Sequence, residues 1–202
     1  MTSSLREVVV ATGNPGKLLE IRALLGDLAV SLRSMEAFPE ILLPEEGDDY
    51  ETNAVEKARA AARDAGRLAL ADDSGLEVAG LDGRPGPFSA RFGGPGLDDA
   101  GRVGALLEAM SALEEDARAA RFVCVAALAT PGGEVAAARG ECRGRILAEP
   151  RGLGGFGYDP VFELEGESRT LAELLPARKN ALSHRALAFH ALEPALRKHL
   201  KL

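Results

Sequence analysis

The chain has few cysteines and no long apolar run, and each absence narrows the class of protein. Among its 202 residues only two are cysteines, Cys124 and Cys142. Neither has the spacing of a metal ligand, so both are expected to be reduced, structural residues of a cytoplasmic protein. No stretch of about 18 apolar residues is long enough to cross a membrane, and no charged leader precedes an apolar segment at the N-terminus. We therefore expect a soluble, non-exported protein without a membrane partner.

Positive charge is also scarce. The sequence has 24 Lys and Arg against 31 Asp and Glu, a formal net charge of -7, whereas a broad nucleic-acid surface normally needs a basic face. A nucleic acid polymer is therefore not an expected partner. A small anionic ligand remains compatible with this composition, because a local group of cations and backbone N–H groups can bind phosphate. With 46% hydrophobic and 27% charged residues, the chain has the balance of a globular protein with a real core.

The first motif follows a β-branched run, Glu7–Ala11, and reads Thr12-Gly13-Asn14-Pro15-Gly16-Lys17. Apolar residues then recur at helical spacing, at Leu18, Ile21, Leu25 and Leu28. A strand, a glycine loop and a helix in this order present backbone N–H groups and a helix N-terminus to a phosphate, and Lys17 adds positive charge. The loop departs from the Walker pattern, since its first glycine is misplaced and no Ser or Thr follows Lys17. A plain strand-to-helix turn explains it nearly as well.

A pair of adjacent carboxylates follows the apolar run Leu68–Ala71. We interpret this segment as a buried strand that brings Asp72 and Asp73 to the edge of a sheet, with a turn at Ser74-Gly75 where the backbone approaches a ligand. Adjacent carboxylates repel each other, so their natural uses are to hold a hard cation or to shift one partner's pKa for base catalysis. The alternative is a solvated turn, because Asp, Ser and Gly are common turn residues.

A dense acid patch, Glu45-Glu46-Gly47-Asp48-Asp49, precedes an expected helix from about Tyr50 to Ala65. The patch fits a solvated loop or the acidic first turn of that helix. The helix has a stripe of alanines and ends at Gly66. Its polar residues Asn53 and Lys57 face either water or a cleft.

The later segments predict three more helices and a hairpin. Asp98 or Asp99 is expected to cap a helix, and Ala119–Thr130 and Glu134–Ile146 are expected to be strands joined by a turn. A second glycine-rich loop covers residues 152–160, a short helix is expected near Leu171–Leu175, and a last helix should kink or break at Pro194. Because strands and helices alternate early and a hairpin follows, the fold class is α/β with a mixed sheet.

Taken together, five segments resemble the RdgB/HAM1 family of inosine triphosphate pyrophosphatases, and the resemblance covers nearly the whole chain. The segments are Thr12–Lys17, Ala71–Leu76, Pro85-Gly86 with Ser89–Arg91, Gly155–Pro160, and Ser183–Arg185. The resemblance implies a single domain over residues 1–202, with an elongated mixed β-sheet and flanking helices in two lobes around a central nucleotide cleft. It also implies a homodimer that uses Mg2+ to hydrolyse ITP, dITP and XTP to the monophosphate and pyrophosphate, which removes non-canonical purine nucleotides from the pool.

The resemblance also assigns roles by position. Asp73 would be the catalytic proton acceptor and a magnesium ligand, and Ser74 would contact the substrate. A second metal carboxylate would lie in the acid patch, where counting back from Asn53 favours Glu45, with Glu46 as the neighbouring alternative. The triphosphate would be held by Thr12, Gly13, Asn14, Pro15, Gly16 and Lys17. The nucleoside side would be lined by Phe156, Gly157, Tyr158, Asp159, Lys179, His184 and Arg185.

The chemistry of these residues agrees with the resemblance. Transfer at the α-phosphorus of a triphosphate needs a cation and fixed N–H donors to offset charge in the transition state. Hypoxanthine and xanthine have a 6-oxo acceptor where adenine has an amino donor. A side chain that only donates hydrogen bonds, such as Arg185, therefore favours binding of the oxo group. Guanine also carries a 6-oxo group, so its rejection must come from contacts near the 2-position. Phe156 or Tyr158 would stack on the purine without discriminating between bases.

Several of these residue assignments have a simpler structural alternative, and the proposed activity has two functional alternatives. Ser183 also fits a helix cap, Phe156 and Tyr158 fit core aromatics, and Arg91 fits a surface ion pair. A pyrophosphatase for modified pyrimidine nucleotides would keep the phosphate chemistry, and a nucleotide-binding protein would have no turnover. The acids at Glu45, Glu46, Asp72 and Asp73 favour catalysis, because binding alone does not need a metal-held water.

Overall fold

The computed structural model describes residues 6–201, and its strands form one mixed seven-stranded sheet. The strand order is β2-β1-β3-β5-β6-β7, and β4 pairs with β3. Strand β1 is parallel to β2 and β3, whereas β4 is antiparallel to β3 and β7 is antiparallel to β6. The expected mixed α/β class is therefore confirmed. The strands are β1 (Arg6–Val10), β2 (Val30–Ser34), β3 (Leu68–Val78), β4 (Pro85–Gly86), β5 (Ala119–Ala129), β6 (Val135–Ile146) and β7 (Phe162–Leu164).

The chain divides into two compact units. The first comprises the residues up to Asp73, Cys124–Gly140 and the residues from Arg185 onward, and the second comprises Ser74–Val123 and Glu141–His184. Strands β3, β5 and β6 each have residues in both units. The helices are α1 (Pro15–Leu24), α2 (Tyr50–Ala65), α3 (Asp99–Ala109), α4 (Pro176–Leu182) and α5 (His184–Leu200).

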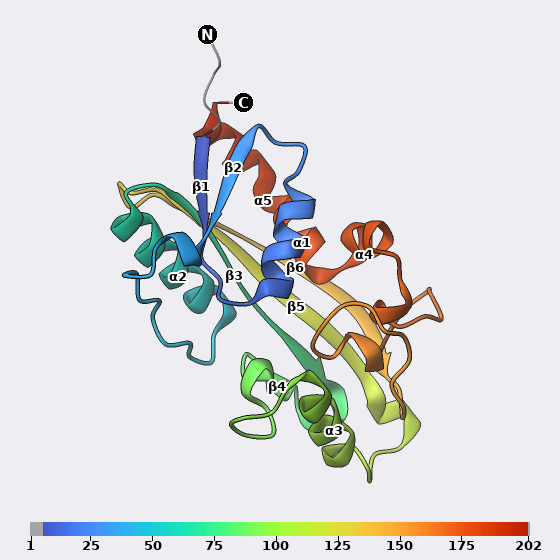
Figure 1. The fold of residues 1–202 in the computed structure, drawn as a ribbon. Helices are drawn as coiled ribbons and strands as arrows, with labels where there is room; N and C mark the ends of the chain where they lie inside the picture. Colours follow the sequence, from blue (N-terminus) through green and yellow to red (C-terminus); the bar gives the residue numbers. More distant parts are fainter. Residues whose placement is uncertain (1–5, 202) are drawn as a thin grey trace. The chain divides into compact units, whose positions relative to one another are not determined.

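The core of the first unit is built from β1 and the helices beside it. The β-branched residues Val8 and Val10 are fully buried, and they share a cluster with Ile21 of α1 and Phe189 of α5. Figure 1 shows β1 and β2 (blue) with α1 and the red helix α5 around them. Helix α2 buries all of its alanines except the half-buried Ala65, and these side chains are small enough to allow close packing.

The second unit has its own core, on one face of its strands. Leu76 of β3 and Phe162 of β7 are fully buried and share a cluster with Leu106 of α3. Alternate residues of a strand point to opposite faces of a sheet. Glu77 of β3 and Glu163 of β7, which are neighbours of these core residues in the strands, therefore point to the other face.

Helix ends follow the capping residues of the sequence. The Asp49 Oδ1 atom accepts from the backbone N–H of Thr52 at 2.8 Å, and α2 ends at Gly66, whose φ of 62° is left-handed. Asp98 caps α3 in the same way, through a 2.8 Å bond from Gly101 N. The bounds predicted for α2 are confirmed, and Asp98 rather than Asp99 is the cap.

Among three local predictions, the turn at Ser74-Gly75 and the break at Pro194 are wrong, whereas the short helix near Leu171–Leu175 is confirmed. Strand β3 continues through Ser74 and Gly75 without a turn, so the two aspartates lie within the strand, after its pairing with β1 ends at Leu70 and before its pairing with β4 begins at Leu76. The short helix is a 3-10 helix at Leu171–Glu173, and α4 begins after it at Pro176. Helix α5 continues through Pro194 without a break. Leu192 and Leu196 flank this proline and are buried, and their packing keeps the helix intact despite the lost backbone donor.

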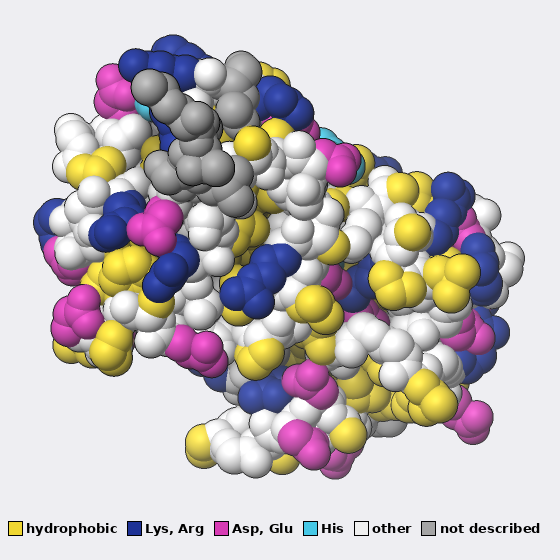
Figure 2. Space-filling view, turned by 45° about the horizontal axis from the view of Figure 1, so that its top comes forward, with side chains coloured by type: hydrophobic (Ala, Val, Ile, Leu, Met, Phe, Trp, Pro, Cys, Tyr) yellow, Lys and Arg dark blue, Asp and Glu magenta, His cyan; other side chains and the backbone are white. Residues whose placement is uncertain are grey.

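The surface mixes charges of both signs. Figure 2 shows lysine and arginine side chains interspersed with aspartate and glutamate across one face, with hydrophobic side chains between them. Within residues 6–201, no helix combines the length and the apolar character that a membrane crossing requires.

Candidate active site

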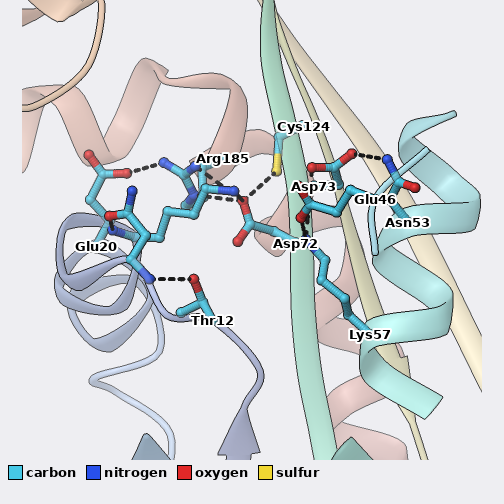
Figure 3. A network of polar contacts seen from close by, with 11 residues as sticks. Thr12, Glu20, Glu46, Asn53, Lys57, Asp72, Asp73, Cys124 and Arg185 are labelled. Carbon is cyan, nitrogen blue, oxygen red and sulfur yellow. Dashed lines mark hydrogen bonds and ion pairs between the residues drawn. The ribbon is translucent and has the colours of Figure 1, made fainter. Parts of the chain in front are cut away.

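Two adjacent aspartates of β3 form the centre of the candidate site. Because consecutive residues of a strand point to opposite faces, Asp72 and Asp73 face different surroundings. Both are buried, with 1% and 2% of their surface exposed. Figure 3 shows Asp72 directed toward Arg185 and Cys124, and Asp73 directed toward Asn53.

Asp72 lies among cations. Its Oδ2 atom is 3.1 Å from Lys17 Nζ and 3.1 Å from Arg185 Nη2, and the Cys124 thiol donates to it at 3.9 Å. Burial alone would raise the pKa of Asp72, but Lys17 and Arg185 bring that pKa far below its usual value. Within the described part of the chain, its Oδ1 atom is buried without a hydrogen-bond partner. Asp72 is therefore a permanent anion that holds Lys17 and Arg185 in place.

Arg185 is fixed from two sides. Its Nη1 atom pairs with Glu20 of α1, and its Nε and Nη2 atoms donate to Asp72 at 3.3 and 3.1 Å. Burial would lower the pKa of this guanidinium, but Asp72 and Glu20 raise it above its usual value. Arg185 is thus always charged and held rigidly, and Glu20 is a member of this network that the sequence did not reveal.

Asp73 has a milder environment. The Asn53 side chain donates to its Oδ2 atom at 2.8 Å, and Lys57 Nζ lies 3.8 Å from its Oδ1 atom. Burial raises the pKa of Asp73, and Lys57 and Asn53 oppose that rise only in part. A buried carboxyl with a raised pKa is the form that suits a general base near neutral pH.

Helix α2 supplies both partners of Asp73. Asn53 and Lys57 are four residues apart and therefore lie on one helix face, and both are buried. The Lys57 ammonium also pairs with Glu46. Burial would lower the pKa of Lys57, but Asp72 and Asp73 raise it above its usual value, so the side chain stays protonated. In the sequence, the sign that Asn53 and Lys57 share a role was their i, i+4 spacing on a helix rich in alanine.

The acid patch reaches this group through Glu46. The Asn53 side chain forms two hydrogen bonds with the backbone of the acid patch: Gly47 N donates to Asn53 Oδ1 at 2.7 Å, and Asn53 Nδ2 donates to Gly47 O at 3.1 Å. Glu45 is exposed, whereas Glu46 is half-buried and paired with Lys57. The structure therefore brings Glu46, rather than Glu45, to the Lys57–Asp73 group.

The loop of residues 12–17 is ordered by its own polar side chains where it leads into α1. The N–H of Asn14 donates to Thr12 Oγ1 at 3.1 Å, and the N–H of Lys17 donates to Asn14 Oδ1 at 3.1 Å. Asn14 is thereby the N-cap of α1, and Pro15 occupies its first turn. A Cβ atom on Gly13 would meet nothing within 4 Å, so the backbone is open there. The loop and the Lys17 side chain lie in the same unit as Asp72 and Asp73.

The second unit brings together another group of predicted site residues. Asp159 is buried, accepts from the backbone N–H of Phe156 at 2.9 Å and pairs with Lys179. The Lys179 ammonium lies 4.9 Å from the centroid of the Phe156 ring, which is a cation–π distance. Ser74, the first residue of this unit, is half-buried.

Two other predicted residues of this unit are buried against neighbours. Tyr158 is 4% exposed, and its hydroxyl donates to Ser89 O at 2.9 Å. The His184 ring stacks on Phe122, with centroids 4.6 Å apart and planes 9° apart. A separate cavity of about 630 Å³ in this unit is lined by none of the predicted site residues, so volume alone does not identify the site.

Comparison with known proteins identifies the chain. A model of the Ham1 family matches residues 8–195. The chain belongs to the Ham1 family. The dITP/XTP pyrophosphatase of Geobacter sulfurreducens is 46% identical over 190 residues, which are 94% of this chain and 96% of that relative. The dITP/XTP pyrophosphatase of Streptomyces coelicolor is 44% identical over 196 residues, which are 96% of this chain and 98% of the relative.

Solved Ham1 structures have the same fold. The HAM1 protein of Coxiella burnetii has a TM-score of 0.85 at 42% identity and covers 96% of this chain and 100% of its own. The nucleoside-triphosphatase, or dITP/XTP pyrophosphatase, of Mycobacterium abscessus has a TM-score of 0.74 at 43% identity, over 93% of this chain and 99% of its own. The expected ITPase-like fold is therefore confirmed for this Ham1 protein.

The donor set of this Ham1 protein fits a hard cation. Within residues 6–201, no group of three or more His, Cys, Asp or Glu residues forms a closed metal cage. Magnesium is usually bound by one or two carboxylates and completes its shell with water and substrate phosphates. Asp73 and Glu46, which both contact Lys57, provide that number of carboxylates.

Proposed function

We propose that this Ham1 protein hydrolyses the non-canonical purine nucleotides ITP, dITP and XTP to the monophosphate and pyrophosphate. One observation carries the proposal beyond family membership: a buried carboxyl with a raised pKa, Asp73, lies next to a permanently charged aspartate that holds the lysine of a glycine loop. This arrangement combines a base with a phosphate site. The names of its curated relatives, dITP/XTP pyrophosphatases, support the choice of substrate.

In the proposed mechanism, the loop of residues 12–17 binds the phosphates. Its backbone N–H groups and the N-terminus of α1 attract anions, and Lys17 adds a full charge. The protonated Lys57 offsets further charge as the transition state forms. Because Asp72 holds the Lys17 ammonium, this donor does not have to be ordered when the substrate arrives.

Asp73 accepts the proton of the attacking water. The water oxygen forms a bond to the α-phosphorus, the bond from that phosphorus to the α,β-bridging oxygen breaks, and pyrophosphate leaves with the electron pair. The hydrogen bond from Asn53 orients the carboxylate for this transfer. Ser74, the next residue of β3, contacts the substrate.

Mg2+ is the proposed cofactor, held by Asp73 and one carboxylate of the acid patch. The contact with Lys57 favours Glu46 for this role, and Glu45 remains the neighbouring alternative. Such an ion supplies charge neutralisation of the phosphates and lowers the pKa of a bound water.

The nucleoside side is assigned to Phe156, Gly157, Tyr158, Asp159, Lys179, His184 and Arg185. The Phe156 ring stacks on the purine, and the neighbouring Lys179 is a donor without acceptor capacity. Such a donor favours a 6-oxo group over the amino group of adenine. Discrimination against guanine is assigned to contacts near the 2-position.

Assembly and location complete the proposal. The protein is proposed to act in the cytoplasm and to be a homodimer. Sedimentation velocity on the purified protein tests the dimer. A monomer at micromolar concentration would remove the dimer from the proposal and leave the chemistry untouched.

The substrate assignment is tested with a panel of ITP, dITP, XTP, GTP, ATP and dUTP, each with and without magnesium. Pyrophosphate release is expected from the first three only, and only with the metal. Release of orthophosphate would contradict attack at the α-phosphorus, and equal rates with GTP would contradict the specificity. Release from dUTP alone would favour a pyrimidine enzyme, and no release would favour a binding protein.

A further inference from the structure

We propose that Asp99 is a positioning residue, which fixes the aromatic loop (residues 155–158) and so holds the Phe156 ring ready for the purine. The sequence suggested Asp99 only as an alternative helix cap, a role that Asp98 takes, and none of the five motifs includes it. The inference rests on the proposed function, because it takes Phe156 as the residue that stacks on the base.

Three consecutive residues of the aromatic loop are anchored to three different places. The N–H of Phe156 donates to Asp159 at 2.9 Å, and the N–H of Gly157 donates to Asp99 Oδ2 at 2.7 Å. The Tyr158 hydroxyl donates to Ser89 O at 2.9 Å. Asp159 directly follows the loop in sequence, whereas Asp99 lies 58 residues before Gly157, in α3. Asp99 therefore ties the loop to a separate, rigid element.

The loop needs such an anchor because of its composition. Gly155 and Gly157 have φ angles of 71° and 59°, which glycine adopts without strain. Glycine also loses the most conformational freedom on ordering, so a loop built on it is mobile unless polar contacts hold it. Asp99 accepts a hydrogen bond from the backbone N–H of Gly157, and this bond sets the direction of the chain directly after Phe156.

Asp99 is itself well placed to serve as an anchor. It is the first residue of α3, but the neighbouring Asp98 already caps this helix. The Asp99 carboxylate is thereby left available for the loop, at a helix end where negative charge is favourable. Arg102, one turn later, lies 3.3 Å from Asp99 Oδ1 and donates to Ala90 O at 2.7 Å. Asp99 is thus held from its own helix and binds the loop with its other oxygen.

The expected consequence is on binding and not on the chemical step. The half-buried Phe156 ring has the Lys179 ammonium 4.9 Å away, so its orientation is set before substrate binds. If the loop were released, each binding event would have to order it, which weakens substrate and transition state equally. Loss of the Asp99 anchor should therefore raise KM and leave kcat nearly unchanged.

Steady-state kinetics with ITP and three variants test this. Asp99→Ala is expected to raise KM about fivefold with kcat within about twofold, which is the effect of losing one ordering hydrogen bond. Asp99→Asn retains an acceptor oxygen and should restore most of the affinity. Asp98→Ala is the matched control, because it removes the cap of the same helix without a contact to the loop. An equal rise of KM in Asp98→Ala would mean that helix stability, rather than the loop, is responsible, and would overturn the inference.

A double-mutant cycle decides whether Asp99 acts through the ring. In a Phe156→Ala background, Asp99→Ala should raise KM no further, because the side chain that the loop positions is gone. A full additional fivefold rise would overturn the inference while leaving the proposed function intact. If Phe156→Ala itself leaves KM unchanged while the wild-type protein hydrolyses ITP, the base-side role of Phe156 is wrong and the inference is overturned with it. Absence of ITP hydrolysis by the wild-type protein would overturn the proposed function itself.

Discussion

Asp72 and Asp73 are adjacent in sequence, yet their carboxylates have opposite electrostatic settings. Asp72 is surrounded by Lys17 and Arg185, so its pKa is far below the usual value. Asp73 meets an amide and one ammonium, and burial leaves its pKa raised. Two carboxylates whose pKa values are pushed apart by their surroundings take different roles, one as a fixed charge and the other as a base. The strand geometry that points them to opposite faces is the cause of this division.

The fixed charge of Asp72 predicts a large loss of stability on its removal. In Asp72→Asn, the buried guanidinium of Arg185 loses one of its two carboxylate partners and keeps Glu20, and breaking a buried pair in this way costs up to about 3–5 kcal/mol. Urea unfolding measures the change. Asp64→Asn is the control, since the Arg63–Asp64 pair is on the surface, and it should change stability very little. Equal losses in the two variants would contradict the account of Asp72.

The two thiols predict low reactivity in the folded protein. Burial raises the pKa of Cys142 to about 11, and it raises the pKa of Cys124 further, since Asp72 adds to the effect. At pH 8 little of either thiol is the reactive thiolate. Ellman's reagent should therefore react slowly with the native protein and rapidly with both thiols in guanidinium chloride. A thiol that reacts at once in the native protein would show that its surroundings are more open than described.

At the scale of elements, the backbone φ angle at a helical position determines whether glycine is required there for stability. Gly66 ends α2 with a left-handed φ of 62°, and Gly104 lies within α3. A Cβ atom at either position would meet nothing within 4 Å. Only the backbone conformation distinguishes them, so the pair isolates that effect from packing.

Opposite effects on stability are predicted for these two glycines. Gly66→Ala places a side chain in the left-handed region and should destabilise by about 1–2 kcal/mol. Gly104→Ala should stabilise by about 0.4–1 kcal/mol, because alanine is favoured inside a helix and loses less chain entropy on folding. Thermal unfolding of both variants measures the difference. A loss of stability in Gly104→Ala would indicate a packing constraint that the structure does not contain.

At the scale of the whole molecule, two compact units share the strands β3, β5 and β6. A unit that unfolded alone would have to end three strands in mid-course and expose backbone groups there. We therefore expect one cooperative transition. The two tyrosines provide the probe, because Tyr50 lies in the first unit and Tyr158 in the second.

Single-tyrosine variants test this cooperativity. Tyr50→Phe leaves Tyr158 as the fluorescent reporter of the second unit, and Tyr158→Phe leaves Tyr50 as the reporter of the first. Each variant's fluorescence transition in urea should coincide with the far-UV circular dichroism transition of that same variant. Transitions at separate urea concentrations within one variant would show that the units unfold independently.

Much of this arrangement was predictable from the sequence, and the exceptions have physical causes. The ends of α2 follow from Asp49 and Gly66, which act through local hydrogen bonds and φ preferences. The continuation of β3 through Ser74-Gly75 was not predictable locally, because the place of β3 in the sheet overrides the turn preference of these residues. The pairing of Lys57 with Asp73 and that of Glu20 with Arg185 join residues far apart in the chain, and they become evident only in three dimensions.

The measurement that tests the central claim most directly is pyrophosphate release from ITP by Asp73→Asn. The substitution keeps the size of the side chain and removes its capacity to accept a proton, so kcat should fall by at least about a hundredfold, the usual range for a general base. Circular dichroism and the urea midpoint should remain close to wild type. A variant that is folded and retains near wild-type kcat would contradict the assignment of Asp73 as the base of this Ham1 protein.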